Sequence, residues 1–380
     1  MQRTRRWRTI AALLTTFTLI AAACGGDDDA DTSSGSSSAS KSESASAGES
    51  ESASASEMAE EDESGSASEM AEEDESGSAS EVADGETVTL SDMTGEITVP
   101  IVTENILALD EYAAIAMLTL GLTPSATAQF YGDFYDAGEN AIIEGSGTKW
   151  IETDNLEVLA VEAPSMMLGL GHPNYEPVIE QHREIAPTIY PLFSSTWQDQ
   201  TRVYGEVTGT SDRAEAVIAA VEARTEEVKA AIDDAGLTGA EVSILHVFPG
   251  EYYAYNPGTL AGTVIGSLGF TRPEFQQTED EFGFLLFSEE ELGSQTSSDI
   301  VIWMDTRFEG SIFDEPLSAL RDDAIGVQLI SSWTANHALG AWIMLEDVER
   351  IVTGQPPVEA GAGVAEAYGE LIAAIEAQLG

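Results

Sequence analysis

The sequence predicts an α/β protein in which two lobes are joined by a single long helix. Residues 211–235 have the pattern of one unbroken helix, and strand and helix patterns alternate both before and after it. Its apolar residues recur at steps of three and four, which gives one apolar stripe on a charged rod. The stripe consists of Ala214, Val217, Ile218, Val221, Val228 and Ile232.

Both ends of this helix carry the expected signals. Ser211 or Asp212 can cap its start, and with Asp212 as the cap, Glu215 occupies the position of a capping-box carboxylate. Gly236 follows the last turn, where glycine readily adopts the left-handed conformation that stops a helix. At 1.5 Å per residue the helix would span roughly 37 Å, about the width of a domain.

The region before the long helix, residues 86–210, has the pattern of a first lobe. Residues 86–99 contain two alternating runs around Met93-Thr94-Gly95, which predicts a hairpin. An aromatic loop is expected at 130–135. Further strands are expected at 106–109, 124–130, 165–170 and 188–190, and helices at 113–120, from 155 onward, and at 175–184.

The region after it, residues 237–380, repeats the alternation and forms the second lobe, with 211–236 as the linking helix. Alternation of this kind predicts mainly parallel sheets flanked by helices. Strands are expected at 241–248 and 300–304, and helices at 260–269, 288–292, 317–320, 338–352 and 364–379.

Residues 1–24 have the pattern of an export signal. Four arginines precede the apolar run 10–23, which is too short for a membrane-spanning helix, and Ala21-Ala22-Ala23-Cys24 resembles the lipobox of bacterial lipoproteins. We therefore expect lipidation of Cys24, the only cysteine in the chain. The mature chain can then form no internal disulfide, so the fold must depend on its core.

Residues 25–85 lack the composition of a packed core. Ser, Ala, Glu, Gly and Asp dominate, no aromatic residue occurs, and SASEMAEEDESG at 54–65 is repeated at 66–77. We interpret this segment as a disordered acidic tether. As a random coil it would reach about 40–47 Å on average, and charge repulsion would extend it.

The chain is strongly acidic, with a formal net charge of −53. Residues 86–380 carry ten Lys or Arg against 49 Asp or Glu, which argues against a nucleic-acid partner because phosphate binding needs clustered bases. A solvated acidic surface suited to a salty habitat is the simpler explanation of this charge, and attraction of cationic partners is the alternative.

From about 86 to 354 the chain resembles the iron-siderophore and cobalamin class (class III) of periplasmic solute-binding proteins of ABC importers. The similar pieces occur in the family's order, although Ala163-Pro164-Ser165 replaces the usual Lys-Pro-Asp and the Pro-Lys-Arg before the first strand is missing. These pieces are ILALDEY, LTLGLTP, NLEVLAVEAPSMMLG, REIAPTIY, the long helix, LGFTRP, SEEEL and SSDIVIW.

The resemblance implies a ligand held between the lobes, and limited hinge motion because one rigid helix joins them. It also implies that one glutamate on each lobe docks onto the membrane permease. By motif these are Glu157 of Asn155-Leu156-Glu157 and Glu290 of SEEEL. A glutamate at a helix start is alternatively explained by the helix dipole.

A large chelate needs aromatic walls and a few cationic or hydrogen-bonding groups. By similarity, Phe275 and Trp333 match aromatic positions of the family's cleft, and Tyr131 and His172 lie near others. Core packing is the alternative for each aromatic residue, and we expect it for about half of them. The candidates are Tyr131, Lys149, Trp150, His172, Trp197, Tyr252, Tyr255, Phe275, Trp303, Arg307 and Trp333.

We therefore expect an exported, lipid-anchored, monomeric binding protein on the outer face of the cytoplasmic membrane. It would capture an iron(III)-siderophore or related chelate for an ABC permease, without a cofactor or bare metal, since only four dispersed histidines are present. Haem or cobalamin, with His172 as axial ligand, remains open. A tethered hydrolase is the alternative of another class, although no Gly-x-Ser-x-Gly or His-Glu-x-x-His motif occurs.

Overall fold

The long helix α6 spans Ser211–Asp234, as its apolar stripe predicts. All six stripe residues are buried, and Gly236 has a φ of +71°, the left-handed conformation expected at the stop. The predicted capping was wrong, because the N-cap is Thr210, which makes no side-chain capping bond. Glu215 instead accepts from Arg202 Nε at 2.8 Å, an ion pair between α6 and the preceding helix.

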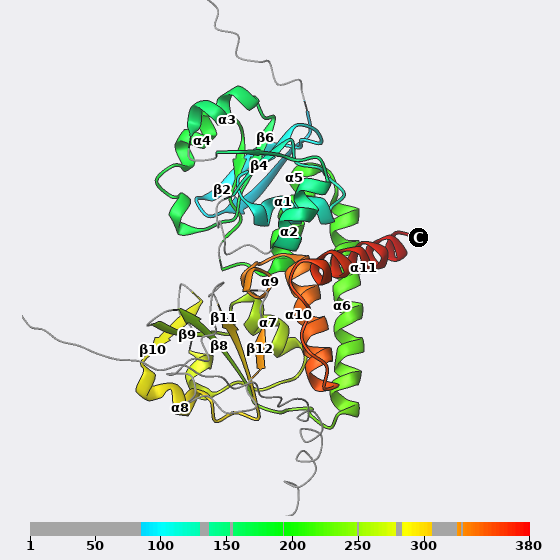
Figure 1. The fold of residues 1–380 in the computed structure, drawn as a ribbon. Helices are drawn as coiled ribbons and strands as arrows, with labels where there is room; N and C mark the ends of the chain where they lie inside the picture. Colours follow the sequence, from blue (N-terminus) through cyan, green and yellow to red (C-terminus); the bar gives the residue numbers. More distant parts are fainter. Residues whose placement is uncertain are drawn as a thin grey trace, which may run out of the picture. The chain divides into compact units, whose positions relative to one another are not determined.

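Figure 1 shows the computed structural model of the chain. It describes residues 85–129, 137–152, 155–192, 194–248, 251–278, 283–305, 325–327 and 330–380. The predicted signal with Cys24, the tether, the aromatic loop with Tyr131, the segment with Arg307 and the helix at 317–320 lie outside these residues. None of the helices in the described ranges is long and apolar enough to cross a bilayer.

The elements before α6 form the N-terminal lobe. The predicted hairpin is present, with β1 paired antiparallel to β2, and β3, β6 and β7 form a parallel sheet of order β3-β6-β7. A second parallel pair joins β4 to β5. The strands are β1 Thr87–Asp92, β2 Gly95–Pro100, β3 Ile106–Ala108, β4 Ala126–Ala128, β5 Lys149–Ile151, β6 Met166–Leu168 and β7 Thr188–Ile189.

The helices of this lobe include two that the sequence pattern did not reveal, α2 and α5. α5 begins at the N-cap Thr196, whose hydroxyl accepts from Asp199 N at 3.1 Å, and ends at the left-handed Gly209. Gly205 of α5 lies so close to α6 that a Cβ there would be 2.7 Å from the Ala214 Cβ. The helices are α1 Glu111–Thr119, α2 Ala137–Gly145, α3 Leu156–Glu162, α4 Ile179–Ile185 and α5 Trp197–Thr208.

The elements after α6 form the C-terminal lobe around one five-stranded sheet of order β10-β9-β8-β11-β12. The predicted strands β8 and β11 run parallel as expected. Strand β12, which was not predicted, joins them in parallel, and β9 and β10, also not predicted, pair antiparallel at one edge. The strands are β8 Val242–Phe248, β9 Glu251–Tyr255, β10 Phe284–Phe287, β11 Ile300–Asp305 and β12 Ile325–Val327.

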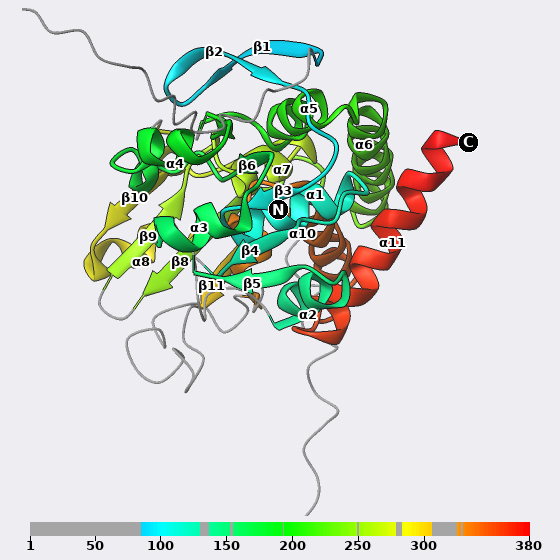
Figure 2. The same cartoon turned by 90° about the horizontal axis from the view of Figure 1, so that it is seen from above.

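Helices of the C-terminal lobe cover this sheet, and two of them return to α6. α10 matches its predicted range, and both it and α11 pack on α6, as Figures 1 and 2 show. α11 also contacts α2 of the N-terminal lobe, so the last helix joins both lobes. The helices are α7 Leu260–Ser267, α8 Leu292–Gln295, α9 Ile330–Thr334, α10 Ala338–Val352 and α11 Ala362–Leu379, and 3₁₀ turns are η2 Pro173–Tyr175, η3 Glu274–Gln277 and η4 Glu289–Glu291.

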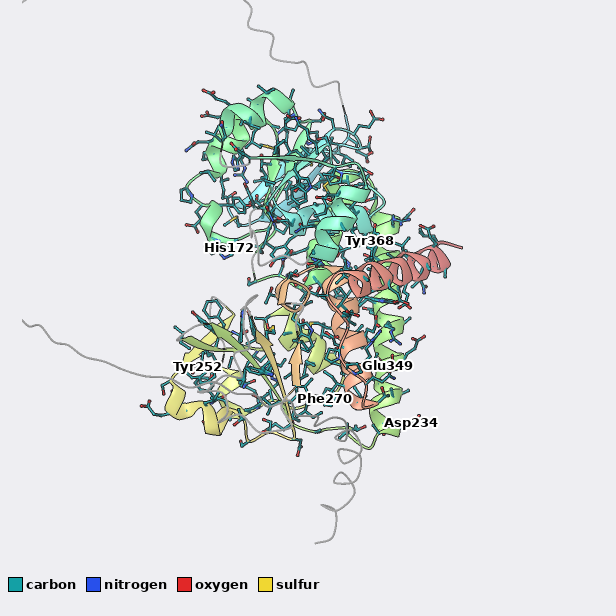
Figure 3. The ribbon with its side chains drawn as sticks, viewed as in Figure 1. His172, Asp234, Tyr252, Phe270, Glu349 and Tyr368 are labelled. Atoms are coloured by element: carbon teal, nitrogen blue, oxygen red, sulfur yellow. The ribbon has the colours of Figure 1, made fainter. Side chains whose placement is uncertain are left out.

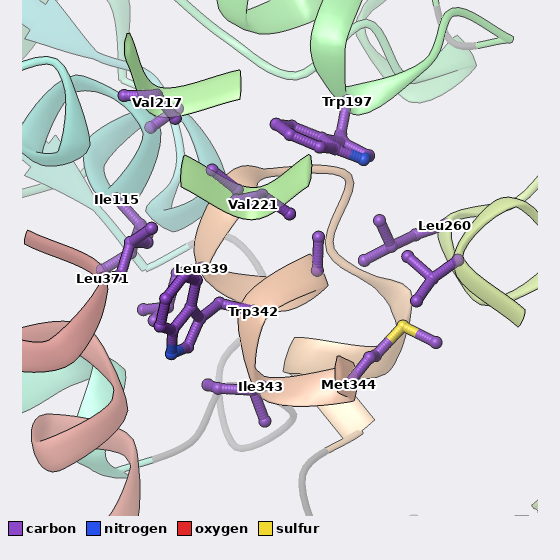
Figure 4. Close-up of a cluster of buried hydrophobic side chains, with 14 of the residues drawn as sticks. Ile115, Trp197, Val217, Val221, Leu260, Leu339, Trp342, Ile343, Met344 and Leu371 are labelled. Atoms are coloured by element: carbon purple, nitrogen blue, oxygen red, sulfur yellow. The ribbon is translucent and has the colours of Figure 1, made fainter. Parts of the chain in front are cut away.

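The largest apolar core is continuous across both lobes along α6. In Figure 4, Val217 and Val221 of α6 lie among Ile115 of α1, Trp342 of α10 and Leu371 of α11. Burial of large apolar side chains contributes about 1.5–3 kcal/mol each, so α6 is held by both lobes over its length.

Candidate functional site

The two lobes meet through polar side chains next to the first turn of α1 and the turn between α9 and α10. Asn336 Nδ2 donates to the carbonyl oxygen of Ser195 at 2.7 Å, and the hydroxyls of Tyr112 and Thr334 lie 3.5 Å apart. The Tyr112 ring also packs edge-on against His337, with ring centres 5.8 Å apart. These contacts define an interlobe site built from α1, the loop before α5, and the α9–α10 turn.

Asp110 positions the N-terminal lobe's part of this site. Its buried carboxylate caps α1 by accepting from Ala113 N at 2.8 Å, and it also accepts from Leu170 N at 2.7 Å and from Tyr175 Oη at 3.2 Å. Burial raises the pKa of Asp110 to about 6, against the lowering effect of these donors. One carboxyl group thereby links the start of α1, where Tyr112 lies, to the loop after β6.

A small cavity of about 10 Å³ lies at the base of the interlobe site. Tyr112, Gln200 and Leu170 line it from the N-terminal lobe, and Asn336 and His337 line it from the C-terminal lobe. Gln200 is 4% exposed, and its amide nitrogen has no hydrogen-bond partner within the described structure. A cavity of this size has room for about one water molecule, which could satisfy that amide.

A buried carboxylate, Glu139 of α2, connects the lobes beside this cavity. It accepts from the hydroxyls of Ser331 and Ser332 on α9, the latter at 3.4 Å, and all three residues are buried. His337 Nε2 lies 3.9 Å from the same carboxylate. Because buried carboxylates need hydrogen-bond donors, this group fixes α9 of one lobe against α2 of the other.

The Ser, His and Glu of this cluster are not arranged as a hydrolytic triad. The hydroxyls of Ser331 and Ser332 donate to Glu139, and His337 Nδ1 accepts from Gly340 N at 3.0 Å as the cap of α10. Burial lowers the pKa of His337 to about 3, so the ring is neutral with its proton on Nε2. A nucleophile and base need mutual contact and access to substrate, which this buried group does not provide.

We expect Glu139→Gln to loosen the lobes, because an amide nitrogen would then face one of the seryl hydroxyls. The free energy of unfolding should fall by about 1–3 kcal/mol. Amide hydrogen exchange should become faster than in the wild type, and α2 and α9 should show this increase before the rest of the chain does. Glu144→Gln, an exposed glutamate on the same helix, serves as the control; equal exchange in both variants would contradict the role of Glu139.

In the C-terminal lobe the structure adds a polar pair and a buried cation. The Tyr255 hydroxyl is 2.7 Å from His246 Nδ1, and the two rings stack with centres 5.7 Å apart. Arg272 is 7% exposed, and its Nη2 donates to the Tyr255 carbonyl and to Gln276 Oε1, both at 2.6 Å. Burial lowers the pKa of Arg272 to about 10. Arg272 therefore holds the backbone of Tyr255 in place through its carbonyl oxygen.

Apart from Tyr131, which lies outside the described residues, the predicted ligand residues of the N-terminal lobe occupy separate places. Lys149 is exposed and pairs with Glu162, and Trp150 is half-buried against the core. His172, labelled in Figure 3, is half-buried after β6, and burial lowers its pKa, which favours a neutral ring. Trp197 is buried at the start of α5, where it lines a cavity beside α6.

The predicted ligand residues of the C-terminal lobe that the structure describes divide between core and partly exposed positions. Trp303 and Trp333 are fully buried, which favours the alternative of core packing for both. Phe275 and Tyr255 are half-buried, and Tyr252, labelled in Figure 3, is 8% exposed and packs against Phe287. Pattern alone could not distinguish these cases, because an aromatic residue after a strand suits either position.

The predicted docking glutamates are both exposed, one on each lobe. Glu157 occupies the first turn of α3, whose N-cap Asn155 accepts from Glu157 N at 3.1 Å. Glu290 lies in η4, where its neighbour Glu291 caps the turn by accepting from Ser288 N at 2.9 Å. The side chains of Glu157 and Glu290 are thus presented to solvent by turns that other residues stabilise.

The residues that join the lobes were mostly missed from the sequence. Tyr112, Glu139 and Asn336 were not among the candidates, although Tyr112 stands directly after the Asp-Glu pair that opens a helix. Among the described residues no group of three or more His, Cys, Asp or Glu side chains is placed to hold a metal ion. The described part of the site thus offers hydroxyl, amide, imidazole and aromatic groups.

Trp333 belongs to a buried network with Asp347 of α10. The indole Nε1 donates to Asp347 Oδ2 at 2.7 Å, and Val358 N donates to Oδ1 at 2.6 Å. Burial raises the pKa of Asp347 to about 7. This carboxyl group ties α9, which carries Trp333, and the segment before α11 to the middle of α10.

The pKa values of Asp347 and His337 predict opposite pH dependences. With a pKa of about 7 against 3.8, folded Asp347 retains an extra proton, so its contribution to stability falls as pH rises from about 4 to 7. With a pKa of about 3 against 6.5, folded His337 lacks a proton, so its contribution rises over the overlapping range from about 3 to 6.5. Asp110 acts in the same direction as Asp347.

We expect Asp347→Asn to remove the contribution of Asp347 to stability, which falls as pH rises. Its free energy of unfolding should therefore increase with pH more steeply than that of the wild type between pH 4 and 6.5. Urea denaturation across this range measures the slopes, and Asp234→Asn at the exposed end of α6 should follow the wild type. A profile of Asp347→Asn parallel to the wild type would contradict this assignment.

The chain resembles siderophore-binding proteins in sequence and in fold, although no protein-family profile matches it. A curated relative, the probable siderophore-binding lipoprotein YfiY of Bacillus subtilis (strain 168), is 28% identical over 203 residues, which are 51% of this chain. The matched region spans 61% of that relative's length. The sequence likeness therefore covers part of each protein.

Solved structures share the fold over nearly their whole length. The FhuD protein from S. pseudintermedius aligns with a TM-score of 0.61 at 16% identity, over 71% of this chain and 99% of that chain. FhuD2 from Staphylococcus aureus with bound ferrioxamine B aligns with a TM-score of 0.53 at 16% identity, over 69% of this chain and 98% of that chain. The siderophore periplasmic binding protein from the fuscachelin gene cluster of Thermobifida fusca aligns with a TM-score of 0.53 at 22% identity, over 66% of this chain and 96% of that chain.

Proposed function

We propose that this chain, which has the class III periplasmic-binding-protein fold, is the substrate-binding component of an ABC importer for an iron(III)-siderophore or related chelate. The observation that carries the proposal is the curated relative described as a siderophore-binding lipoprotein. The fold supports it, since the aligned solved structures are covered at 96–99% of their length. The role is binding and delivery, with no chemical step.

A bulky chelate would lie at the edge of the interlobe site, because the cavity inside it measures only about 10 Å³. Tyr112, Asn336 and Thr334 offer hydrogen-bonding groups from both lobes, and Tyr255 and His172 offer partly exposed rings. Uncharged donors and aromatic faces bind a large chelate mainly through shape and hydrogen bonding. The ligand is held while α6 keeps the two lobes at a nearly constant separation.

We propose further that Cys24 is the lipid attachment point and that residues 25–85 act as a tether. The relative's description as a lipoprotein supports an anchored protein. An anchor of this kind would place the binding unit on the outer face of the cytoplasmic membrane. Glu157 and Glu290, exposed on different lobes, would then dock onto the permease.

Titration of intrinsic tryptophan fluorescence in the full chain tests the substrate class. The panel should hold ferric hydroxamate, catecholate and carboxylate chelates, together with haem and cobalamin. Saturable quenching by one ferric chelate is expected. Saturation by haem or cobalamin alone would retain the fold and replace the cargo, with the neutral imidazole of His172 as the first axial ligand to test. No response to any of them would contradict the proposal.

A further inference from the structure

A second cavity lies beside α6, outside the interlobe site. Its volume is about 560 Å³, within the range of small-molecule sites. Its apolar lining comes from Trp197 of α5, Val221 of α6, Val264 of α7 and Leu345 of α10. In Figure 4, Trp197 and Val221 lie close together near the start of α7 at Leu260. An occupant of this α6 cavity would contact both lobes and the helix that joins them.

The hydroxyl groups that line the α6 cavity can act only as acceptors toward an occupant. Thr225 donates to the Val221 carbonyl at 2.9 Å, Thr263 to the Leu260 carbonyl at 2.9 Å, and Ser267 to the Val264 carbonyl at 2.7 Å. Each hydroxyl hydrogen is used within its own helix, while the oxygen lone pairs remain. Toward these three groups the occupant must therefore act as a donor, while the Gln198 amide in the same lining can either donate or accept.

The charges of the cavity also favour a cationic occupant. Lys229 donates to Glu226 at 2.6 Å, so these two lining residues neutralise each other. Glu222 lines the same cavity at a solvent-exposed position, and no ion pair of Glu222 occurs among the residues that the structure describes. Arg202, which interacts electrostatically with Glu222, is already paired with Glu215 and Asp199. One carboxylate of the lining is therefore left without a cation.

We propose that the α6 cavity is a binding site for a protonated alkylamine. The ammonium group would donate to Glu222 and to the hydroxyl oxygens, and the alkyl chain would lie on Val264 and Leu345 beside the Trp197 indole. A cation next to an indole face gains a further cation–π contribution. This proposal is independent of the chelate, since it uses none of the interlobe contacts.

Calorimetric titration of the full chain with n-hexylamine at physiological ionic strength tests this site, with 1-hexanol as the uncharged comparator. Saturable 1:1 binding of the amine is expected, with hexanol binding at least about tenfold more weakly because it lacks the charged donor. Salt at this level screens attraction by the acidic surface as a whole. Absence of saturable binding, or equal binding of hexanol, would overturn the proposal.

Three variants locate the site. Glu222→Gln, which keeps the shape of the side chain, should weaken amine binding about tenfold. Glu206→Gln, an exposed glutamate of α5 outside the cavity, should leave it unchanged. Ala219→Leu, which fills space at the lining, should abolish binding while the melting temperature shows that the chain remains folded. Equal effects of the two glutamine variants, or normal binding by Ala219→Leu, would refute the site.

Discussion

Iron-chelate uptake is expected to be lost in a Glu157→Ala/Glu290→Ala double variant that still binds the chelate normally. Both side chains are exposed on different lobes, and neither makes a hydrogen bond or ion pair within the described structure. Their removal should therefore leave the fold intact. Each lost charge-assisted contact with the permease would cost about 1.5–3 kcal/mol, so the double change should reduce uptake at least about a hundredfold.

Uptake of radiolabelled iron by cells that depend on this protein measures the effect, and fluorescence titration of the purified variant measures chelate binding. A Glu144→Ala/Glu359→Ala variant provides the control, since it removes two exposed glutamates from other surfaces. Normal uptake by the docking variant would show that these residues are not the contacts. Loss of chelate binding would show that they belong to the ligand site.

Trp333→Ala is expected to lower the free energy of unfolding by about 3–5 kcal/mol, as for large core residues. The indole is fully buried, and its loss also leaves Asp347 with one donor fewer. The chelate affinity of the molecules that remain folded should be unchanged. This result would establish a structural role at a position that sequence similarity places in the ligand cleft.

Urea denaturation and chelate titration of the same preparation separate the two roles. Trp150→Ala is a suitable comparison, because that indole is only half-buried and its nitrogen has no partner in the described part of the chain. It should cost less than half as much stability. A Trp333→Ala variant with wild-type stability and weakened chelate binding would return Trp333 to the ligand site.

The fold was largely predictable because its main signals are local. The stripe on α6, the hairpin of β1 and β2, and the capped starts of α1 and α3 each depend on residues within one or two turns of each other. The missed elements lacked such signals. Strand β9 is defined by its pairing with β8 and β10 on either side, and α5 has a mixed sequence in which only Thr196 and Gly209 mark the ends.

The sequence by itself determined the α/β alternation, the linking helix, the acidic segment before the folded region and the resemblance to siderophore-binding proteins. Tertiary structure alone decided which aromatic residues are core and which side chains join the lobes. Glu139 meets Ser331 across 192 positions of sequence, and Tyr112 meets Thr334 across 222. Local patterns carry no information on such pairs, because which residues meet depends on how both lobes pack against α6.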